Sequence, residues 1–383
     1  MRYTTAGESH GPALVAIVSD VPAGVPLSQA AIDEDLARRQ RGYGRGGRMA
    51  IESDRARVLS GVRFGVTLGS PVALVIENRD WQNWSEVMSA FGATTTERSV
   101  TAPRPGHADL AGALKTGASD IRDILERASA RETAARVAAG AVAKALLAEL
   151  GVAVHSYVAR IGAAAIAQEP DPRELDVAAI EVSDVRCPDA AIAREMRAAI
   201  DAASAAGDSL GGIVVVVATG LVPGLGSYAQ ADLRLDARIG SAMLSIPALR
   251  GVEIGDGFAA ASLSGSRVHD PIRFEAGHGI VRRTNHAGGL EGGMTNGEPV
   301  VVRAAMKPIP TLTSALESVD LATLEPVDAA RERSDVCAVP AVGVVAEAEL
   351  ALVLATAYAE KFGGDSLAEL GAALGTYRSR LPR

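Results

Sequence analysis

The feature that most constrains the fold is a long alanine-rich segment from about Ser119 to Leu150. Alanine, leucine, glutamate and lysine favour helix, Ser119 or Asp120 could cap its start, and Gly151 stands where a helix C-cap is expected. The segment therefore predicts one long helix, or two helices with a break near Arg127–Ala130. Because aromatic residues make up only 3% of the chain, the core must be built from alanine, valine, leucine and isoleucine.

Short runs of β-branched residues predict several strands. Ala13–Val18 and Val72–Glu77 are two of these runs, and Gly211–Ala218 predicts a central, buried strand. Further strand-like pieces lie at Val252–Ile254 and Val300–Ala304. The composition of residues 340–362 favours a second helix near the C-terminal end.

The 383 residues show no internal repeat, no low-complexity linker and no break in composition, so a single domain over residues 1–383 is the simplest prediction. The N-terminus lacks a basic region followed by an apolar stretch, and the longest purely apolar run is Ile213–Ala218. Glu347 and Glu349 interrupt the apolar C-terminal segment. Two cysteines form no disulfide framework. We expect a soluble, cytoplasmic protein without a membrane partner.

Five arginines, spaced by glycines, fall within Arg38–Arg48. Guanidinium groups bind phosphate and carboxylate through paired hydrogen bonds, so the cluster predicts a site for a small dianionic ligand. A solvated charged loop and an RNA-binding segment are the alternatives. The net charge of −8 and the presence of only Tyr43 among the arginines count against RNA.

The glycines of the same segment match a dinucleotide-binding pattern, Gly42-x-Gly44-x-x-Gly47. That pattern requires a hydrophobic strand immediately before it. Arginines precede it here, so we reject this interpretation.

Two histidines lie in short, glycine-containing segments, His10 in Gly7–Gly11 and His107 in Pro103–Asp109. Imidazole suits proton transfer near neutral pH. Taken alone, His10 is equally well explained as an exposed turn residue, and His107 is slightly better explained as structural. Asp335 lies in a run of arginines that would keep its carboxylate ionised. Together these residues indicate an enzyme that binds phosphorylated anions.

Three further segments complete the pattern. Glu126–Thr133 could bind an anion at a helix start, although an ordinary charged helix face explains it better when it is taken alone. In Lys307–Thr311, two prolines fix an extended backbone that ends in a hydroxyl group. His278 and His286 lack the spacing of a zinc site, and no Walker motif is present. We predict no metal site.

In this order, the segments resemble the chorismate synthase family, and the resemblance covers nearly the whole chain. The matching motifs are GESHG at Gly7–Gly11, RRQRGYGRGGRM at Arg38–Met49, PGHAD at Pro105–Asp109, ERASARETAARVAAGAVAK at Glu126–Lys144, GVEIGDGF at Gly251–Phe258, NHAGGLEGGMTNGEP at Asn285–Pro299, KPIPTL at Lys307–Leu312 and RSDVCAVPA at Arg333–Ala341. The resemblance implies an α+β fold with helices sandwiched between two antiparallel β-sheets in one domain, assembled as a homotetramer.

The activity that the resemblance implies is a 1,4-anti elimination of phosphate from 5-enolpyruvylshikimate 3-phosphate, giving chorismate and requiring reduced flavin mononucleotide (FMN). An external reductant would supply the reduced flavin, with NADPH as a candidate. The main rivals are a related flavoprotein acting on another phosphorylated substrate and an anion-binding or RNA-binding protein that uses Arg38–Arg48. The intact arginine cluster argues against the first, and the second leaves both histidines unexplained.

The resemblance also implies roles for individual residues. His10, with Ser9 beside it, would protonate or stabilise the departing phosphate, His107 would lie near the N1/O2 edge of the flavin, and Asp335 would relay a proton from flavin N5. Binding of substrate or NADP(H) is implied for Arg39, Arg45, Arg48 and Arg131. Contacts with the flavin are implied for Arg127, Ala128, Ser129, Pro247, Ala248, Gly292, Lys307, Pro308, Ile309, Pro310, Thr311 and Arg333, the last of which would also clamp the substrate.

Overall fold

An antiparallel sheet of four strands is formed by the N-terminal part of the chain. The computed structural model describes residues 1–46, 53–332 and 335–382. In spatial order the strands are β1 (Arg2–Ala6), β2 (Ala13–Ser19), β6 (Val72–Glu77) and β3 (Ala56–Ser60). The predicted strands Ala13–Val18 and Val72–Glu77 are confirmed as β2 and β6. Valine, leucine and isoleucine alternate inward along β6 because successive side chains point to opposite faces.

A second antiparallel sheet has five strands. Their order is β10 (Leu249–Ile254), β15 (Val300–Met306), β9 (Gly212–Thr219), β7 (Ala153–Ile161) and β8 (Ala164–Ala165). The strand predicted over Gly211–Ala218 is confirmed as the central strand β9, and its valines are buried on both faces. The two shorter predicted strands are confirmed as parts of β10 and β15.

Helices and small hairpins complete the mixed α+β fold. The helices are α1 (Gln29–Gln40), α2 (Asp109–Thr116), α3 (Arg122–Leu125), α4 (Thr133–Glu149), α5 (Val177–Val182), α6 (Ala190–Ala205), α7 (Leu235–Leu244), α8 (Gly257–Ala260), α9 (Gly265–Val268), α10 (Val339–Phe362) and α11 (Leu367–Ser379). The two-stranded hairpins are β4 (Val62–Arg63) with β5 (Val66–Thr67), β11 (Ile272–Glu275) with β12 (Gly279–Arg282), β13 (Leu290–Glu291) with β14 (Met294–Thr295), and β16 (Glu317–Val319) with β17 (Pro326–Asp328).

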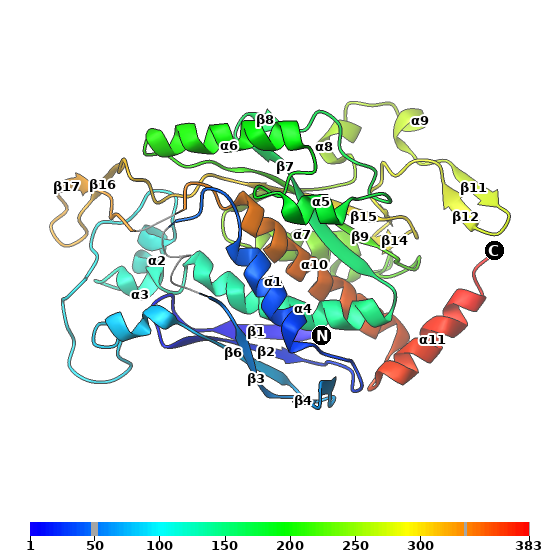
Figure 1. Cartoon of the computed structure of the whole chain (residues 1–383), viewed down its shortest axis with the longest axis horizontal. Coiled ribbons are helices and arrows are strands. Elements are labelled where there is room, and N and C mark those ends of the chain that lie inside the picture. The colour runs from blue at the N-terminus through cyan, green and yellow to red at the C-terminus, as the bar shows by residue number, and fades with distance from the viewer. Residues whose placement is uncertain (47–52, 333–334, 383) are drawn as a thin grey trace.

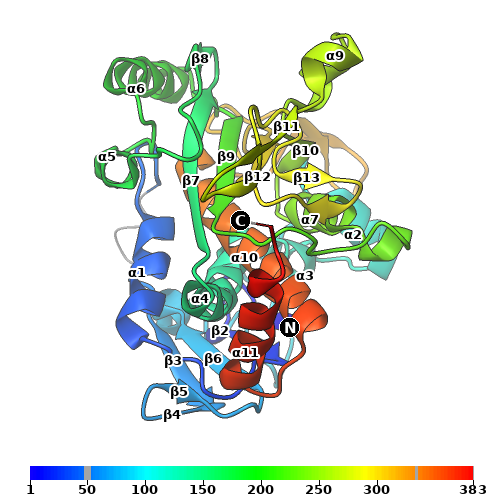
Figure 2. The same cartoon turned by 90° about the vertical axis from the view of Figure 1, so that its right-hand side faces the viewer.

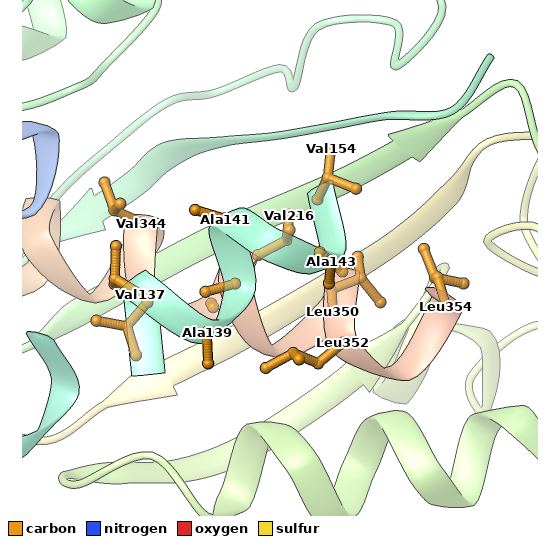
Figure 3. Close-up of a cluster of buried hydrophobic side chains, with 14 of the residues drawn as sticks. Val137, Ala139, Ala141, Ala143, Val154, Val216, Val344, Leu350, Leu352 and Leu354 are labelled. Carbon is orange, nitrogen blue, oxygen red and sulfur yellow. The ribbon is translucent and has the colours of Figure 1, made fainter. Parts of the chain in front are cut away.

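Helices α4 and α10 pack against each other and against the two sheets (Figures 1 and 2). Helix α4 contacts β2 and β6 of the first sheet, α10 contacts β7 and β9 of the second, and the two helices pack against each other. Both are buried on almost every side, as expected for core helices. Figure 3 shows their alanine, valine and leucine side chains meeting Val154 of β7 and Val216 of β9.

The alanine-rich segment is not one continuous helix, and the alternative with a break is confirmed. Helix α3 ends at Leu125, a short 3₁₀ helix covers Ala130–Glu132, and α4 begins at Thr133. Ser129 adopts an extended conformation, and its side chain accepts a hydrogen bond from the N–H of Arg131. The physical reason for the break is tertiary, because Glu126 and Arg131 are buried and bond to His10 and Asp54, which lie far away in the chain.

The C-terminal helix predicted from its composition is confirmed as α10. It is long and apolar enough to cross a membrane by those criteria alone, but 89% of its most apolar window is buried inside the protein. That burial is the property of the core helix of a folded domain. Its N-terminal half also forms one wall of the cavity described below.

Candidate active site

A cavity of about 630 Å³ lies where segments from the whole length of the chain converge. Its walls are the loop between β1 and β2, the end of α1 with the loop after it, the turn before α2 and the break before α4. The connection from α7 to β10, the segment after β15 and the start of α10 close it. Loops on a rigid scaffold are where binding and catalytic residues concentrate.

The cavity is positively charged. Six of its lining side chains are cations, namely Arg39, Arg45, Arg104, Arg131, Arg250 and Lys307. Three are carboxylates, namely Asp80, Glu332 and Asp335. The excess of cations favours an anionic ligand because a partly buried site screens charge less than bulk water does.

One wall of the cavity is apolar. Ala341, Val342 and Val345 present one face of α10 to it, at the spacing of successive helical turns, and Ala338 lies just before the helix. Leu244 and Ile246 at the end of α7, and Met306 at the end of β15, continue the wall. The cavity can therefore accept a flat apolar ring system on one side and anionic groups on the other.

Two buried arginines meet at Asp54. Arg131 donates to Asp54 (2.6 Å) and to Asn78 (2.9 Å). Arg39, near the end of α1, lies 3.4 Å from the other Asp54 oxygen and donates to Thr133 (2.9 Å). Burial lowers the pKa of Arg39 to about 10, against the raising effect of Asp54, so it stays charged at neutral pH. The shared carboxylate holds both guanidinium groups at the cavity wall.

Arg45 and Asp335 form an ion pair of 3.0 Å in the cavity wall. The N–H of Gly46 also donates to Asp335 (2.6 Å), so the loop after α1 and the start of α10 are tied together. Gly44 makes this close approach possible. It has φ +83°, and a Cβ there would lie 2.8 Å from the side chain of Ile200.

His10 is held on two sides. Its Nδ1 lies 2.9 and 3.0 Å from the carboxylate oxygens of Glu126, which also accepts from the His10 N–H (2.8 Å). The ring stacks on Trp84 with a centroid separation of 3.9 Å. Arg122 donates to Glu126 (3.1 Å). Burial alone would raise the pKa of Glu126, but the hydrogen bonds from His10 and Arg122 outweigh it and the pKa is lowered.

His107 has a comparable partner. Its Nδ1 lies 2.5 Å from Asp109 Oδ1, at the start of α2. Arg104 donates to both oxygens of Asp109 and to the hydroxyl of Thr311 (3.0 Å). Burial would raise the pKa of Asp109, but hydrogen bonds from His107 and Arg104 hold it well below its usual range.

Lys307 donates a hydrogen bond to the carbonyl of Gly106, beside His107. Burial and the nearby charge of Arg250 lower the pKa of Lys307. On the adjacent segment before β10, Ala248 has φ +70° and its carbonyl accepts from the Lys307 N–H (3.0 Å). Pro247 precedes it and has no N–H, so any ligand contact there must use its ring or carbonyl group.

The structure brings most of the predicted site residues to this one cavity. They are Ser9, His10, Arg39, Arg45, His107, Ala128, Ser129, Arg131, Pro247, Ala248, Lys307, Ile309, Pro310, Thr311 and Asp335. Arg48 and Arg333 were also predicted, and they lie outside the described residues.

Three predicted contact residues do not line the cavity. Arg127 instead donates to the carbonyls of Thr5 and Gly7 (both 3.1 Å) and so fixes the start of the His10 loop. Gly292 lies in the turn between β13 and β14. Pro308 lies between lining residues but is not one itself. Sequence position alone could not separate these residues from their neighbours.

Several site residues were not predicted. Glu126 and Arg104 lay inside recognised motifs without being singled out. Trp84 is one of only two tryptophans in the chain, a signal that could have been used. Asp80 and Arg250 also line the cavity, but neither lies in a sequence motif that indicates a functional site.

The arginine cluster is divided among different tasks. Arg38 turns inward and bonds to the buried Glu347 (2.8 Å), whereas Arg39 and Arg45 line the cavity. Arg41 is exposed and paired with Glu34 (2.9 Å). The four arginines within the described part of the cluster therefore form no continuous basic surface of the kind that RNA binding needs.

Comparisons with known proteins agree on one family. Residues 1–359 match the family model described as "Chorismate synthase". A chorismate synthase of Symbiobacterium thermophilum is 60% identical over 96% of both chains, and one of Moorella thermoacetica is 57% identical over 100% of this chain and 99% of that protein. A crystal structure of a chorismate synthase superposes with a TM-score of 0.81 at 42% identity, covering 100% of this chain and 98% of that one.

Proposed function

The chain belongs to the chorismate synthase family of lyases, and we propose that its central cavity binds 5-enolpyruvylshikimate 3-phosphate beside reduced FMN. The reaction of the family is the 1,4-anti elimination of phosphate to give chorismate. The observation that carries the proposal is the convergence of His10, His107 and Asp335 with Arg39, Arg45 and Arg131 on one cavity.

The arginines supply the binding half of the proposal. The substrate carries a phosphate and carboxylates, and its phosphate gains negative charge as the carbon–oxygen bond breaks. Arg39 and Arg131 are held in place by Asp54, and Arg45 by Asp335. Preorganised cations that meet developing charge stabilise the transition state without having to reorient. Arg48 and Arg333 remain predicted members of this group.

The two histidines and Asp335 supply the proton chemistry. In this proposal, Nε2 of His10 donates a proton or hydrogen bond to the departing phosphate, with Ser9 beside it. His107 would stabilise negative charge at the edge of the flavin. Asp335 would act as the base for the proton of flavin N5. A positioned proton-transfer group contributes about 10²–10⁴ in rate.

The cavity fits a reduced flavin in its chemistry. The apolar face of α10, with Ile246 and Met306, suits the flavin ring system. Among the residues predicted to contact the flavin, Lys307, Thr311 and Ser129 have polar side chains that could bind its polar groups. When bound, reduced FMN supplies electron density to the breaking carbon–oxygen bond and regains it as the C6 hydrogen leaves. The protein contributes position and electrostatics. An external reductant, with NADPH as a candidate, would supply the reduced flavin.

The test is anaerobic phosphate release from 5-enolpyruvylshikimate 3-phosphate by the purified protein with chemically reduced FMN. We expect catalytic release that disappears when the flavin is left oxidised. His10→Ala and His107→Ala should each reduce the rate by about 10²–10⁴. Absence of release from the wild type, with flavin binding shown by fluorescence, would refute the assigned reaction. Near-full turnover by both variants would refute the histidine assignment.

We further propose that the chain is one domain, with its helices sandwiched between the two sheets, and that it forms a cytoplasmic homotetramer. Contacts of α4 with one sheet and of α10 with the other support the single domain. Ile272, Phe274 and Ile280 of the β11–β12 hairpin are more than half exposed, and exposed apolar side chains of this kind are typical of subunit interfaces. Light scattering should give four times the mass of one chain.

A further inference from the structure

Both cavity histidines have the same arrangement around Nδ1. His10 Nδ1 faces Glu126 (2.9 and 3.0 Å), and His107 Nδ1 faces Asp109 (2.5 Å). Both carboxylate side chains are fully buried, whereas the two rings keep some exposure. The partners come from unrelated positions, 116 residues away for His10 and two residues away for His107. The common arrangement is therefore not a by-product of one local motif.

Each carboxylate is kept ionised by an arginine behind it. Arg122 donates to Glu126 (3.1 Å), and Arg104 donates to Asp109 (2.8 and 3.2 Å). The pKa of both carboxyl groups is lowered although burial alone would raise it. An ionised carboxylate can only accept a hydrogen bond, so an Nδ1 held at 2.5–3.0 Å from one must carry the proton. Arg104 Nη2 also lies 3.1 Å from His107 Nδ1, but the much shorter contact of Nδ1 with Asp109 assigns its hydrogen bond to the carboxylate. Each ring is then left with Nε2 for a ligand.

We propose that Glu126 and Asp109 are positioning residues of the reaction, which fix the Nδ1–H form of His10 and His107 and so present Nε2 to the bound ligands. Neither carboxylate lines the cavity, so each acts through its histidine. The inference rests on the proposed function. The same carboxylates stabilise the imidazolium that forms when Nε2 accepts a proton, and His10 donates from Nε2 to the departing phosphate in that protonated form.

Asp109→Asn is the sharpest variant. Oδ2 of Asp109 accepts from the N–H and the Nε–H of Arg104, whereas Oδ1 accepts from Nδ1 of His107 and from Arg104 Nη2. An asparagine keeps more of these bonds when its oxygen takes the Oδ2 place and its NH₂ group faces His107. That NH₂ group donates, so Nδ1 must lose its proton and the proton moves to Nε2.

Glu126→Gln provides the parallel case. Glu126 Oε2 accepts from the His10 N–H, and Oε1 accepts from Arg122. Either orientation of the glutamine side chain places an NH₂ group against one of these donors. With its oxygen in the Oε2 place, the glutamine still accepts from the N–H and Nδ1 of His10 but loses the bond from Arg122. In the other orientation its NH₂ group faces the His10 N–H, so the substitution weakens the arrangement around His10 either way. A matched control is Asp256→Asn, because Asp256 pairs with His286 Nδ1 (2.6 Å) and neither residue lines the cavity.

The experiment uses the full-length protein with ¹⁵N-labelled histidine rings, in which two-bond nitrogen–proton correlations report the protonated nitrogen of each of the six histidines. The spectra are recorded without any ligand, and kcat and KM for phosphate release are measured separately. We expect Nδ1–H rings at His10 and His107 in the wild type. In Asp109→Asn, only the cavity ring of His107 should change form, and kcat should fall by about 10²–10⁴ with little change in KM. Asp256→Asn should leave both cavity rings and kcat unchanged.

Wild-type rings with the proton on Nε2 alone would overturn the proposal, as would unchanged kcat in both cavity variants. If Asp109→Asn fails to fold, the kcat of Glu126→Gln and the wild-type spectrum test whether the carboxylates fix the Nδ1–H form. A wild type that releases no phosphate refutes the proposed function instead, because the ring spectra still report whether the carboxylates orient the histidines.

Discussion

At the scale of single residues, the cavity depends on arginines whose geometry matters as much as their charge. Arg45 illustrates this, since its guanidinium lies 3.0 Å from Asp335 and also faces the cavity. A planar fork can serve a carboxylate of the protein and an anionic ligand at the same time, which a lysine ammonium cannot do with the same directions.

We therefore predict that Arg45→Lys raises KM for the substrate about 10-fold or more, with a smaller effect on kcat. The change keeps the charge but removes a charge-assisted hydrogen bond, which contributes about 1.5–3 kcal/mol. Steady-state kinetics of phosphate release measure it. Arg41→Lys is the control from the same segment, because Arg41 is exposed and lies outside the cavity. Equal KM values for the two variants would contradict the prediction.

The site residues that could be predicted from the sequence are those in motifs of glycine, histidine and arginine. His10, His107 and Arg45 belong to this group, because residue type and spacing indicate their chemistry directly. Asp80 and Arg250 could not be predicted in this way. Their positions depend on how distant segments meet, and no local pattern records that.

At the scale of elements, the sequence predicted the strands and the C-terminal helix well but left open whether the alanine-rich segment is one helix or two. The strands were predictable because short, apolar runs of β-branched residues, such as Gly212–Thr219, favour buried strands over helix or loop. The break before α4 was offered only as an alternative. Helix propensity favours a continuous helix there, but buried hydrogen bonds from His10 to Glu126 and from Arg131 to Asp54 stabilise the break.

The contact between α4 and α10 depends on one glycine, and we predict that Gly140→Ala destabilises the protein by about 1–3 kcal/mol. A Cβ at position 140 would lie 2.2 Å from the Cβ of Ala348 and 2.5 Å from its Cα, so the helices would have to separate. This cost exceeds the gain of about 1 kcal/mol in helix propensity. Urea denaturation followed by circular dichroism measures the change.

Gly375→Ala in α11 is the matched control for that substitution. Gly375 is exposed, and a Cβ there would have no neighbouring atom within 4 Å. Only the propensity effect remains, so stability should rise by about 0.5–1 kcal/mol. If both substitutions stabilise the protein, α4 and α10 can accommodate the added methyl group, and the prediction for Gly140→Ala is wrong.

At the scale of the whole molecule, a buried charge network joins elements from distant parts of the chain. Glu347 of α10 accepts hydrogen bonds from Arg38 of α1, Lys144 of α4 and Arg186. Ser156 of β7 donates to the same carboxylate (2.7 Å). Arg38 stands next to Arg39, so the network also fixes the end of the helix that presents Arg39 to the cavity.

We predict that Glu347→Gln costs about 3 kcal/mol at pH 7, because Arg38, Lys144 and Arg186 lose the buried carboxylate that they share and keep Asp35 and Glu181 as counter-ions. Burial would raise the pKa of Glu347, but Lys144, Arg38 and Arg186 hold it well below its usual range. Its contribution to stability is therefore complete above the unfolded pKa of about 4.3 and is lost as pH falls through the folded value. Urea denaturation from pH 7 to pH 3 should show a shallower loss of stability in the variant than in the wild type.

Glu349 lies two residues further along the same helix, and its effect on the pH dependence of stability should be opposite to that of Glu347. Burial raises the pKa of Glu349, and the bonds from Tyr3 and Arg136 offset this only in part. A raised folded pKa means that the folded state binds the extra proton, so this group adds stability below its unfolded pKa and loses that contribution as pH rises through the folded pKa. Glu349→Gln removes a term that opposes acid unfolding. In the same pH series, Glu349→Gln should lower the free energy of unfolding at pH 7 by less than Glu347→Gln does. It should also make the loss of stability towards acid pH steeper than in the wild type. Parallel stability curves for the two variants would contradict the opposite roles assigned to the two carboxylates.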